Sequence, residues 1–528
     1  MMITKTETIK YLQYCCFLMS NLSIESLATF CKKKGFVYQN SEIYNSIAGF
    51  FDYGPYGVDL KNNIKQEWWK YHVTSRPDIV GIDGSIITHP KVWEASGHAA
   101  NFADIMLTCK KCKTKIRADH FIEDKLKIPA DGMSPEEINT LINKNNLKCP
   151  SCKDDFEKVS HFNLMFSTNV GPVASKDSQT FLRPETAQVI FTNFKLVTEN
   201  ARLKLPFGIA QIGKAFRNEI SPRDFLFRAR EFEQMEIEYF IHPEKSDECP
   251  FLSTMLKHKV LVYSEEMQKK KQKPAQLSMK ECLDKKIIKT PWHAYFLALE
   301  HQWFISLGAN KDNFRIRQHV QTEKSHYALD TWDLEYQFPF GWKELQGLAN
   351  RTDFDLQQHM KHSKQDLTLF DEEQKKKIVP NVVCEPSLGV GRAFLVFMFD
   401  AYTDDKKRGN IVLKLHPKLA PVKAAVLPLV NKLDKDARKV FDDLIKSFPC
   451  TYDKPGSVGR RYARADELGI PYCITFDFDS KTDKAVTIRD RDSTKQVRVK
   501  IIDLPDTLFS LLYNDIKFEK AGKPVKTS

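Results

Sequence analysis

The segment AFRNEISPRDFLFRAREFEQMEIEYF, residues 215–240, constrains the fold of this chain more than any other stretch. Two extended runs, the first ending at Glu219 and the second beginning near Phe227, flank a polar loop with the sequence Ser-Pro-Arg-Asp. This pattern predicts a long antiparallel hairpin. Its arginines are Arg217, Arg228 and Arg230. Guanidinium groups at such sites either hold phosphate oxygens through paired hydrogen bonds or form a cross-strand ion-pair ladder, and the residue types favour neither.

The regions around this segment differ in pattern. Residues 161–402 alternate β-rich runs with charged loops, which predicts a mainly antiparallel sheet. After Gly409, strand-like and helical runs alternate, as in a compact α/β domain, so we expect a boundary near Asn410. Before the sheet region, Leu60, Ile64, Trp68 and Tyr71 predict an amphipathic helix, followed after Pro77 by the strand-like run GSIIT.

Residues 105–160 contain two CxxC pairs, Cys109/Cys112 and Cys149/Cys152, separated by a polar, lysine-rich stretch. Four thiolates at this spacing suit the tetrahedral coordination of Zn²⁺ and leave no open position for catalysis. We therefore expect a structural zinc module in which metal binding contributes to folding.

Composition narrows the class of protein. With 528 residues, the chain is long enough for several domains, and its formal net charge of +12 fits an anionic partner such as nucleic acid. With 42% hydrophobic and 28% charged residues, the composition is that of a folded globular protein and excludes a disordered chain. A membrane-spanning chain is also excluded, because no run approaches the roughly 18 apolar residues that a spanning helix needs. The twelve cysteines, four of them in CxxC pairs, indicate a reduced, cytoplasmic protein. Residues 1–22 are expected to be an extension without a secretory or mitochondrial signal.

A further segment, residues 244–290, is rich in lysine, with Lys269, Lys270, Lys271 and Lys273 close together. This charge pattern indicates a solvated helical insertion, and contact with RNA is the alternative. No internal repeat is evident.

FRNE followed by a loop and RAREF resembles motif 2 of the class II aminoacyl-tRNA synthetases, and SLGVGRAFLVFMF, residues 387–399, resembles motif 3. The helix and extended segment around Pro77 resemble motif 1, which forms dimers in that class. The similarity narrows to the homodimeric glycyl-tRNA synthetase family. It rests on SEIYNSIAGFFDYGPYGVDLKNN, WEASGHAANFAD, FLRPETAQ, PFGIAQIGKAFRNEISPR, REFEQMEIEYF, ANRTDFDL and CEPSLGVGR.

This resemblance implies an α+β architecture. A class II antiparallel-sheet catalytic domain would span residues 23–409 and carry the zinc module as an insertion, and an α/β anticodon-binding domain would span residues 410–528. It also implies ATP-dependent activation of glycine to glycyl-adenylate, with Mg²⁺, and transfer to the 3′ end of tRNA(Gly) by a homodimer.

The same resemblance assigns roles to individual residues. The catalytic groups would be Arg217 at the α-phosphate, Arg392 at the γ-phosphate and Glu219 at the adenine amino group. Mg²⁺ would bind a carboxylate such as Glu344 or Glu385. The full nucleotide set is Arg217, Asn218, Glu219, Phe227, Arg228, Ala229, Arg230, Glu231, Phe232, Glu344, Leu345, Gly389, Val390, Gly391 and Arg392. The amino-acid set is Arg117, Glu185, Phe232, Glu233, Gln234, Met235, Glu236, Glu385, Pro386, Ser387, Leu388 and Gly389.

Three alternatives compete with this interpretation, and one of them, a zinc-dependent nucleic-acid module, would explain only the segment around the two CxxC pairs. Another class II synthetase, for proline, threonine or histidine, would share motifs 2 and 3, but RPETAQ, REFEQME and CEPSLG fit the glycine family better. A non-catalytic binding protein with a synthetase fold would have lost the nucleotide arginines, which are present here. In the C-terminal region, Arg460, Arg461, Arg464, Arg489 and Arg491 are candidates for RNA contact or for a solvated face.

Overall fold

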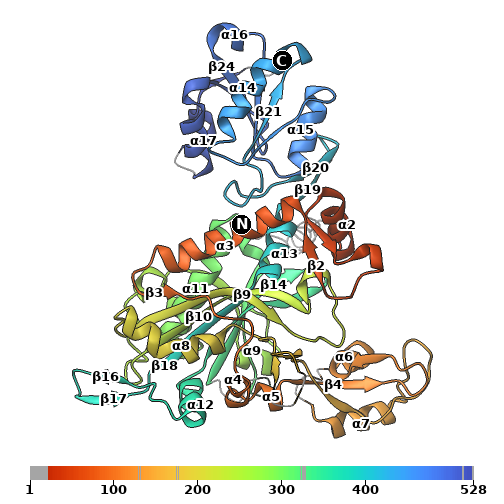
Figure 1. Ribbon diagram of the computed structural model, residues 1–528, viewed down its shortest axis with the longest axis vertical. Coiled ribbons are helices and arrows are strands. Elements are labelled where there is room, and N and C mark those ends of the chain that lie inside the picture. Colours follow the sequence, from red (N-terminus) through yellow and green to blue (C-terminus); the bar gives the residue numbers. More distant parts are fainter. Residues whose placement is uncertain are drawn as a thin grey trace, which may run out of the picture.

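The computed structural model describes residues 22–525 except 129, 131–132, 174, 176–177, 322, 324–328 and 514–515. The predicted N-terminal extension therefore lies, apart from Leu22, outside the described residues. Figure 1 shows a central body, called the catalytic body because it corresponds to the expected catalytic domain, a small module projecting from it in orange, and a C-terminal domain in blue at one end.

The catalytic body is built on a nine-stranded sheet with the order β12-β11-β13-β14-β15-β18-β10-β9-β3. Neighbouring strands are antiparallel except for two pairs, β3 with β9 and β11 with β13, which are parallel. The predicted antiparallel character is thus confirmed. The strands are β3 (Ile79–Gly81), β9 (Phe207–Phe216), β10 (Glu231–Ile241), β11 (Lys259–Tyr263), β12 (Ala275–Ser278), β13 (Phe314–Gln318), β14 (Asp330–Phe338), β15 (Gly341–Asn350) and β18 (Asn381–Gly389).

Each face of this sheet has its own hydrophobic core. One face packs against α3 (Pro55–Trp69), α11 (Pro291–Ser306) and α13 (Val390–Ala401), and the main core of the molecule lies between them. The other face packs against α8 (Ala187–Asn200) and α12 (Phe354–Ser363) around a smaller core. Side chains alternate between the faces along each strand, so sequence parity decides which residues of β10 and β18 reach which side.

The region expected to resemble motif 1 is helical where the periodicity predicts it. Pro55 begins α3, whose Leu60, Ile64 and Trp68 are buried, and a five-residue π-helix, Lys70–Thr74, extends it. Gly57 is required because a Cβ there would lie 1.7 Å from the carbonyl oxygen of Phe36. The strand prediction at GSIIT was displaced: the strand that joins the sheet is Ile79–Gly81, and Ile87 forms only an isolated bridge.

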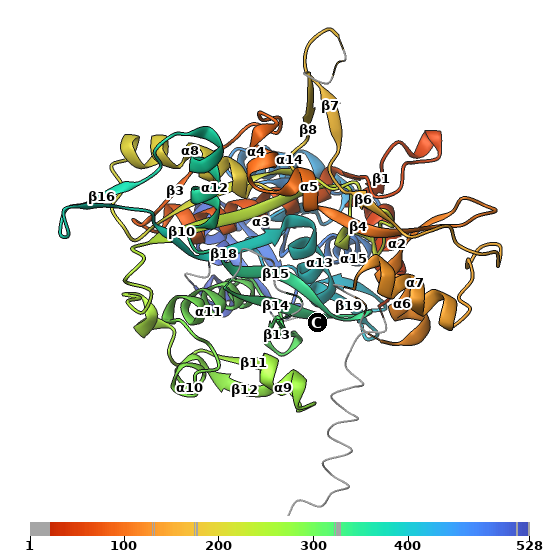
Figure 2. The ribbon, with the colours of Figure 1, turned by 90° about the horizontal axis from the view of Figure 1, so that it is seen from below.

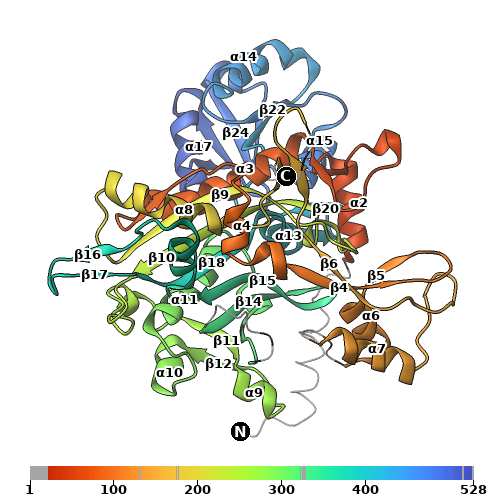
Figure 3. The same ribbon diagram turned by 60° about the horizontal axis from the view of Figure 1, so that its bottom comes forward.

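The lysine-rich insertion corrects another expectation. Instead of a purely solvated helical segment, residues 244–290 supply β11 and β12, which extend the sheet at its outer edge. Figures 2 and 3 show these strands with α9 (Glu265–Lys269) and α10 (Met279–Asp284) at one end of the body. Lys269 and Lys270 do lie at the surface and pair with Glu265 and Glu266. Apolar residues such as Val260 and Val262 are nevertheless buried, which is why the segment folds onto the sheet.

The predicted zinc module, named here for its four cysteines, consists of a three-stranded sheet and two helices. Its elements are β4 (Ala103–Thr108), β5 (Lys115–Arg117), β6 (Ser160–Asn163), α6 (Ala118–Leu126) and α7 (Pro135–Lys144). The stretch between the CxxC pairs is richer in core residues than expected: Phe121, Ile122, Ile138 and Ile142 form a separate core. Ser134 begins α7 with a reciprocal capping box to Glu137. The module therefore has apolar packing as well as its four thiols.

The C-terminal domain alternates strands and helices, as predicted. Three parallel strands are followed by three antiparallel ones, in the order β22-β21-β23-β24-β25-β26. They are β21 (Ala424–Pro428), β22 (Cys450–Tyr452), β23 (Tyr472–Phe476), β24 (Ala485–Asp490), β25 (Gln496–Lys500) and β26 (Lys523–Pro524), with α14 (Asp434–Leu444), α15 (Val458–Glu467), α16 (Ser480–Asp483) and α17 (Leu504–Leu512). Before β21, Leu413, Leu415 and Leu419 pack into the catalytic core.

Smaller elements complete the body. The helices are α2 (Ile24–Lys34), α4 (Lys91–Ala95) and α5 (His98–Asn101). The strands form four two-stranded pairs: β1 (Val37–Gln39) with β2 (Phe51–Tyr53), β7 (Ser167–Asn169) with β8 (Gln179–Phe181), β16 (Leu369–Asp371) with β17 (Lys376–Ile378), and β19 (Tyr402–Asp405) with β20 (Asn410–Leu413).

Candidate active site

The predicted hairpin is formed by β9 and β10, but its arms are shorter than expected. Phe216 pairs with Glu231, and beyond them the backbone amide of Arg217 donates to the carbonyl of Arg230 at 2.9 Å. Residues 217–230 therefore form the connecting loop, and the arginines lie beyond the strand ends. The irregular backbone of this loop places polar side chains where a regular strand could not.

The guanidinium of Arg217 is positioned by one hydrogen bond to a backbone carbonyl and by two aromatic rings. Its Nε–H donates to the carbonyl of Pro184 at 3.1 Å, and its guanidinium lies 5.4 Å from the ring centroids of both Phe102 and Phe232. The bond to Pro184 is the only hydrogen bond that the Arg217 side chain makes among the described residues, so its two Nη groups remain for a ligand. Since no carboxylate of the described residues is paired with this guanidinium, it is available to bind an anion.

The other two arginines have different surroundings. Arg230 donates to the carbonyl of Glu219 at 3.0 and 2.8 Å and to that of Ala48 at 2.9 Å. Arg228 lies 3.7 Å from the carboxylate of Glu219. These residues do not form the cross-strand ion-pair ladder that was the alternative prediction, because the guanidinium of Arg230 bonds to backbone carbonyls. Its bonds hold the loop closed.

Arg392 enters the same region from the first turn of α13. Its Nη1 donates to the side chain of Glu344 at 3.0 Å and to the carbonyl of Glu344 at 2.9 Å, and its guanidinium lies 4.6 Å from the ring of Phe227. Attraction to Arg392 lowers the pKa of Glu344. Gly391, which precedes Arg392, lies close to the loop of the hairpin. A Cβ at this position would lie 3.0 Å from the carbonyl oxygen of Leu226.

These side chains surround a cavity of about 230 Å³. Its lining contains most of the predicted nucleotide residues together with Leu226 and Gly347, which the sequence interpretation did not include. The lining is Arg217, Glu219, Leu226, Phe227, Arg228, Ala229, Phe232, Gln234, Glu344, Gly347, Ser387, Gly389, Gly391 and Arg392.

Five predicted nucleotide residues do not line this cavity. Leu345 and Val390 are fully buried in the main core. Glu231 pairs with Lys214 on the adjoining strand, and the backbone amide of Asn218 donates to Leu164. Arg230 is the fifth, and it supports the loop as described above.

A cluster of buried carboxylates adjoins the cavity. Glu236 and Glu238 of β10 and Glu385 of β18 each place an oxygen within 4.8 Å of the others. The hydroxyl of Thr186 donates to Glu236. Glu185, which precedes Thr186 in the chain, pairs with Nε2 of His98 at 3.3 Å. The predicted residues Glu185, Glu236 and Glu385 are thus brought together from three separate segments.

Arg351 provides the main positive charge of this cluster, and the sequence interpretation quoted its segment without assigning it a role. It donates to Glu385 at 2.8 Å and to both oxygens of Asp355 at 2.7 and 2.8 Å. Burial nevertheless raises the pKa of Glu385 to about 8, since the attraction of Arg351 does not compensate for desolvation and neighbouring glutamates. For Glu185, burial is outweighed by His98 and Arg351, and its pKa is lowered.

The remaining predicted amino-acid residues divide by strand parity. Gln234 and Ser387 share the face of the cluster and are joined by a hydrogen bond of 3.2 Å. Glu233, in contrast, pairs with Lys61 and Lys65 of α3 at 3.0 and 3.1 Å on the opposite face. Met235 and Leu388 are buried in the main core on that side.

Arg117 belongs to the zinc module and stands beside the hairpin loop. It pairs with Asp104 at 2.9 Å and with Asp119 at 2.7 Å. Burial raises the pKa of Asp104 to about 6, and Glu219 of the hairpin loop contributes in the same direction. The module also contacts the loop through Asp124, which lies 3.8 Å from Arg223. The module therefore lies against the hairpin loop, but none of its residues, Arg117 included, lines the cavity.

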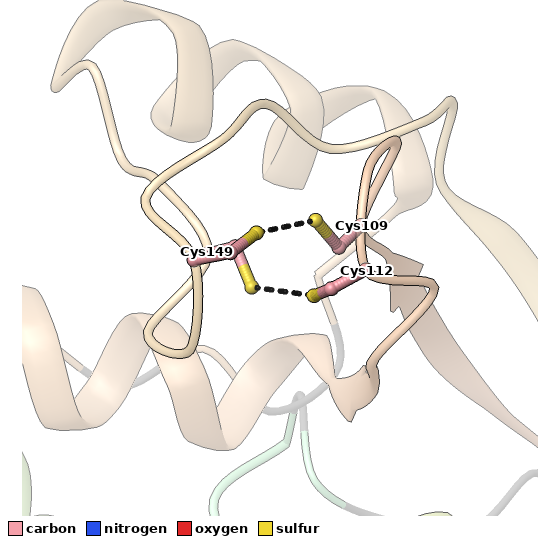
Figure 4. Close-up of side chains that lie close together, drawn as sticks. Cys109, Cys112 and Cys149 are labelled. Atoms are coloured by element: carbon pink, nitrogen blue, oxygen red, sulfur yellow. Dashed lines mark hydrogen bonds between the residues drawn. The ribbon is translucent and has the colours of Figure 1, made fainter.

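The four cysteines meet at the end of this module. The sulfurs of Cys109 and Cys152 lie 3.3 Å apart, those of Cys112 and Cys149 lie 3.6 Å apart, and all four fall within 4.8 Å of one another. In Figure 4 the labelled thiols point into a common centre. Tetrahedral Zn²⁺ with bonds of about 2.3 Å needs sulfurs about 3.8 Å apart. The donor set fits zinc, as the spacing predicts.

Three of the candidate RNA-binding arginines in the C-terminal domain have structural roles. Arg461 donates to the carbonyls of Pro428 and Leu429, Arg489 forms a bidentate pair with Asp466, and Arg491 donates to Gly469 and Leu415; all three are buried. Arg464 pairs with Asp453, and Arg460 is exposed. The expected basic face therefore shrinks to the last two.

The fold is that of a class II aminoacyl-tRNA synthetase. Residues 173–400 match the family model described as the tRNA synthetase class II core domain (G, H, P, S and T), and residues 423–511 match the anticodon binding domain. A solved structure described as the RNA binding domain of threonyl-tRNA synthetase from Cryptosporidium parvum Iowa II has the same fold, with a TM-score of 0.56 at 16% identity, over 93% of this chain and 98% of that one.

Curated relatives identify the particular family. A glycine–tRNA ligase from Ruminiclostridium cellulolyticum is 46% identical, with 91% of this chain and 97% of the relative covered. One from Caldanaerobacter subterraneus subsp. tengcongensis is 44% identical, with 94% and 99% covered. The chain belongs to the glycine–tRNA ligase family, an ATP-dependent group of enzymes, as the sequence interpretation predicted. None of its described helices is both long and apolar enough to cross a membrane.

Proposed function

We propose that the cavity binds ATP, that the carboxylate cluster binds the ammonium group of glycine, and that the two react where these subsites meet. One observation carries this proposal. Gln234 and Ser387 line the cavity, and the next residues of the same parity, Glu236 on β10 and Glu385 on β18, belong to the cluster. An anion-binding cavity and a cation-binding cluster are therefore continuous along one face of the sheet.

In the proposed reaction a carboxylate oxygen of glycine attacks the α-phosphorus of ATP, and the bond from that phosphorus to the bridging oxygen of pyrophosphate breaks. No nucleophilic side chain is required, so catalysis depends on orientation and on stabilising charge. Arg217 would donate to the α-phosphate and Arg392 to the γ-phosphate. Arg392 would exchange its bond to Glu344 for phosphate oxygens.

The adenine ring would lie between the aromatic residues of the hairpin loop. Phe227 and Phe232 both line the cavity, and Glu219 offers a carboxylate oxygen to the adenine amino group. Its position supports this role, because the carboxylate lies 3.7 Å from Arg228, another residue of the cavity lining.

Glycine recognition would rest on charge and on the small size of the subsite. Glu185, Glu236 and Glu385 would accept hydrogen bonds from the ammonium group, with Ser387 beside them. A substrate without a side chain is selected by filling the space that a methyl group would need.

The enzyme would bind two kinds of metal ion, one at the nucleotide and one in the cysteine centre. Mg²⁺ favours hard oxygen ligands, and of the two candidate carboxylates Glu344 lines the cavity, whereas Glu385 is bound to Arg351. When bound, the ion would neutralise charge on the polyphosphate. Structural Zn²⁺ would be held by Cys109, Cys112, Cys149 and Cys152 and would stabilise the module beside the hairpin loop.

Transfer of the glycyl group would require tRNA(Gly) bound along the molecule, with its 3′ end at the catalytic body and its anticodon at the C-terminal domain. We also propose a cytoplasmic homodimer. The reduced CxxC pairs support the compartment. The position of β3 at the end of the sheet, next to α3, supports a dimer contact, and sedimentation analysis would test it.

Exchange of pyrophosphate into ATP with a panel of single amino acids tests the activity. We expect exchange with glycine and none with alanine or serine. Arg217→Ala and Arg392→Ala serve as controls and should abolish the signal. Absence of exchange with glycine, or equal exchange with alanine, would contradict the assignment.

A further inference from the structure

Glu238 lies directly opposite Glu385 on the neighbouring strand. In the antiparallel pair of β10 and β18, Glu236 faces Ser387 and Tyr239 faces Cys384, so the register between them sets residue 238 against residue 385. Side chains in such cross-strand pairs are immediate neighbours, and like charges there are destabilising. An oxygen of each carboxylate lies within 4.8 Å of the other.

The two residues differ in their partners. Glu385 accepts from Arg351, whereas both side-chain oxygens of Glu238 are without a hydrogen-bond partner among the described residues. Glu238 is also completely buried, and the next residue on its face, Phe240, belongs to the apolar core beneath. An isolated ionised carboxylate is strongly destabilised in such a position, and its neutral form is favoured instead.

The charged groups around Glu238 are predominantly negative. Glu236 is on its own strand, Glu385 on β18, and Asp355 on α12. Glu185 acts on Glu236 and adds a fourth carboxylate to the region, but it is paired with His98. Arg351 is the positive neighbour, and its bonds are shared between Asp355 and Glu385. One guanidinium does not balance so many ionised carboxylates in a buried site.

We propose that Glu238 is a neutral carboxylic acid that donates its proton in a hydrogen bond to Glu385 and thereby orients Glu385 toward the ammonium group of glycine. This inference rests on the proposed glycine subsite and adds a positioning residue beneath it. Burial raises the pKa of Glu238 well above its usual value, and Glu385 adds to that effect. Glu238 itself contacts no substrate.

The test compares two substitutions of Glu238 with reference variants in pyrophosphate exchange. Glu238→Gln keeps the shape and a donor but cannot ionise, so we expect the KM for glycine to stay within about threefold of the unsubstituted enzyme. Glu238→Leu removes the donor to a charged acceptor, and its KM for glycine should rise about tenfold or more while the KM for ATP changes little.

Glu236→Gln and Glu385→Gln are the references, because each removes a proposed ammonium ligand and should raise the KM for glycine. If neither does, the glycine subsite itself is wrong. If both do but Glu238→Gln raises KM as strongly, Glu238 is an ionised ligand, and our inference is overturned. No effect of Glu238→Leu on glycine KM would also overturn it.

A spectroscopic measurement covers the case in which Glu238→Leu does not fold. In the infrared difference between the unsubstituted enzyme and Glu238→Gln, both with saturating glycine at neutral pH, we expect the carbonyl band of a protonated carboxylic acid. A band of an ionised carboxylate in its place would refute the proposal.

Discussion

Arg217→Lys is the substitution that most directly tests how the site activates glycine. Lysine keeps the positive charge but loses three features of the arginine: the Nε–H bond to Pro184, the planar contact with Phe102 and Phe232, and the pair of Nη donors. The charge would remain near the α-phosphate without being aimed at it.

The expected loss follows from the chemistry of the transition state. Removing one oriented donor from developing negative charge costs about 2.7–4 kcal/mol, which is about 100- to 1000-fold in kcat. Because Arg217 does not contact the carboxylate cluster that would bind glycine, the KM for glycine should change less than about threefold by the same reasoning.

Arg223→Lys is the matched control, since it is the same substitution in the same loop. The Arg223 side chain is 41% exposed and lies 3.8 Å from Asp124 and 3.6 Å from Asp224. Such exposed pairs contribute between about 0 and 1 kcal/mol, so glycine activation should stay within about fivefold. We would measure pyrophosphate exchange at saturating ATP and glycine. An Arg217→Lys enzyme that keeps its kcat within about fivefold, or an Arg223→Lys enzyme that loses as much, would refute the reasoning.

Four further predictions concern the glutamate cluster, the cysteine centre and two arginines of the C-terminal domain. Glu385 must be ionised to bind an ammonium group, and its pKa is about 8, so kcat/KM for glycine should decrease as the pH falls below that value and increase toward it; a flat profile would contradict this. Cys112→Ser removes one of four thiolates, and we expect loss of bound zinc by metal analysis and a lower Tm, whereas an unchanged metal content would exclude the site. Arg489→Leu leaves the buried Asp466 with one fewer cation and should cost about 3 kcal/mol in urea unfolding. The exposed Arg460→Ala should leave the free energy of unfolding unchanged and raise the KM for tRNA, and the reverse pattern would contradict both assignments.

Local patterns predicted much of the site. The two CxxC pairs indicated a four-sulfur centre, and the hairpin segment indicated an antiparallel pair with arginines in its connection; both are present in the structure. These predictions succeeded because the spacing of residues within one segment controls the geometry. The displaced strand near Pro77 and the strands in the lysine-rich insertion were missed because burial against the sheet outweighed local composition.

Strand parity was readable from the sequence, but which face carries the chemistry was not. Glu233 and Glu236 are equivalent on residue type, yet Glu233 pairs with two lysines of α3, whereas Glu236 meets Glu385 on the other side. The arginines of the C-terminal domain show the same limit: Arg489 and Arg491 look like surface cations and are buried in ion pairs and carbonyl contacts.

The sequence by itself determined the family, the order of the segments and the residue types available for phosphate, ammonium and zinc. The tertiary structure alone decided which of them share a cavity, that Arg351 bonds to Glu385 in the glutamate cluster, and that Glu238 faces Glu385 without a hydrogen-bond partner among the described residues. The physical reason is that charge, burial and pKa depend on neighbours brought together from distant parts of the chain, and a linear pattern does not specify those neighbours.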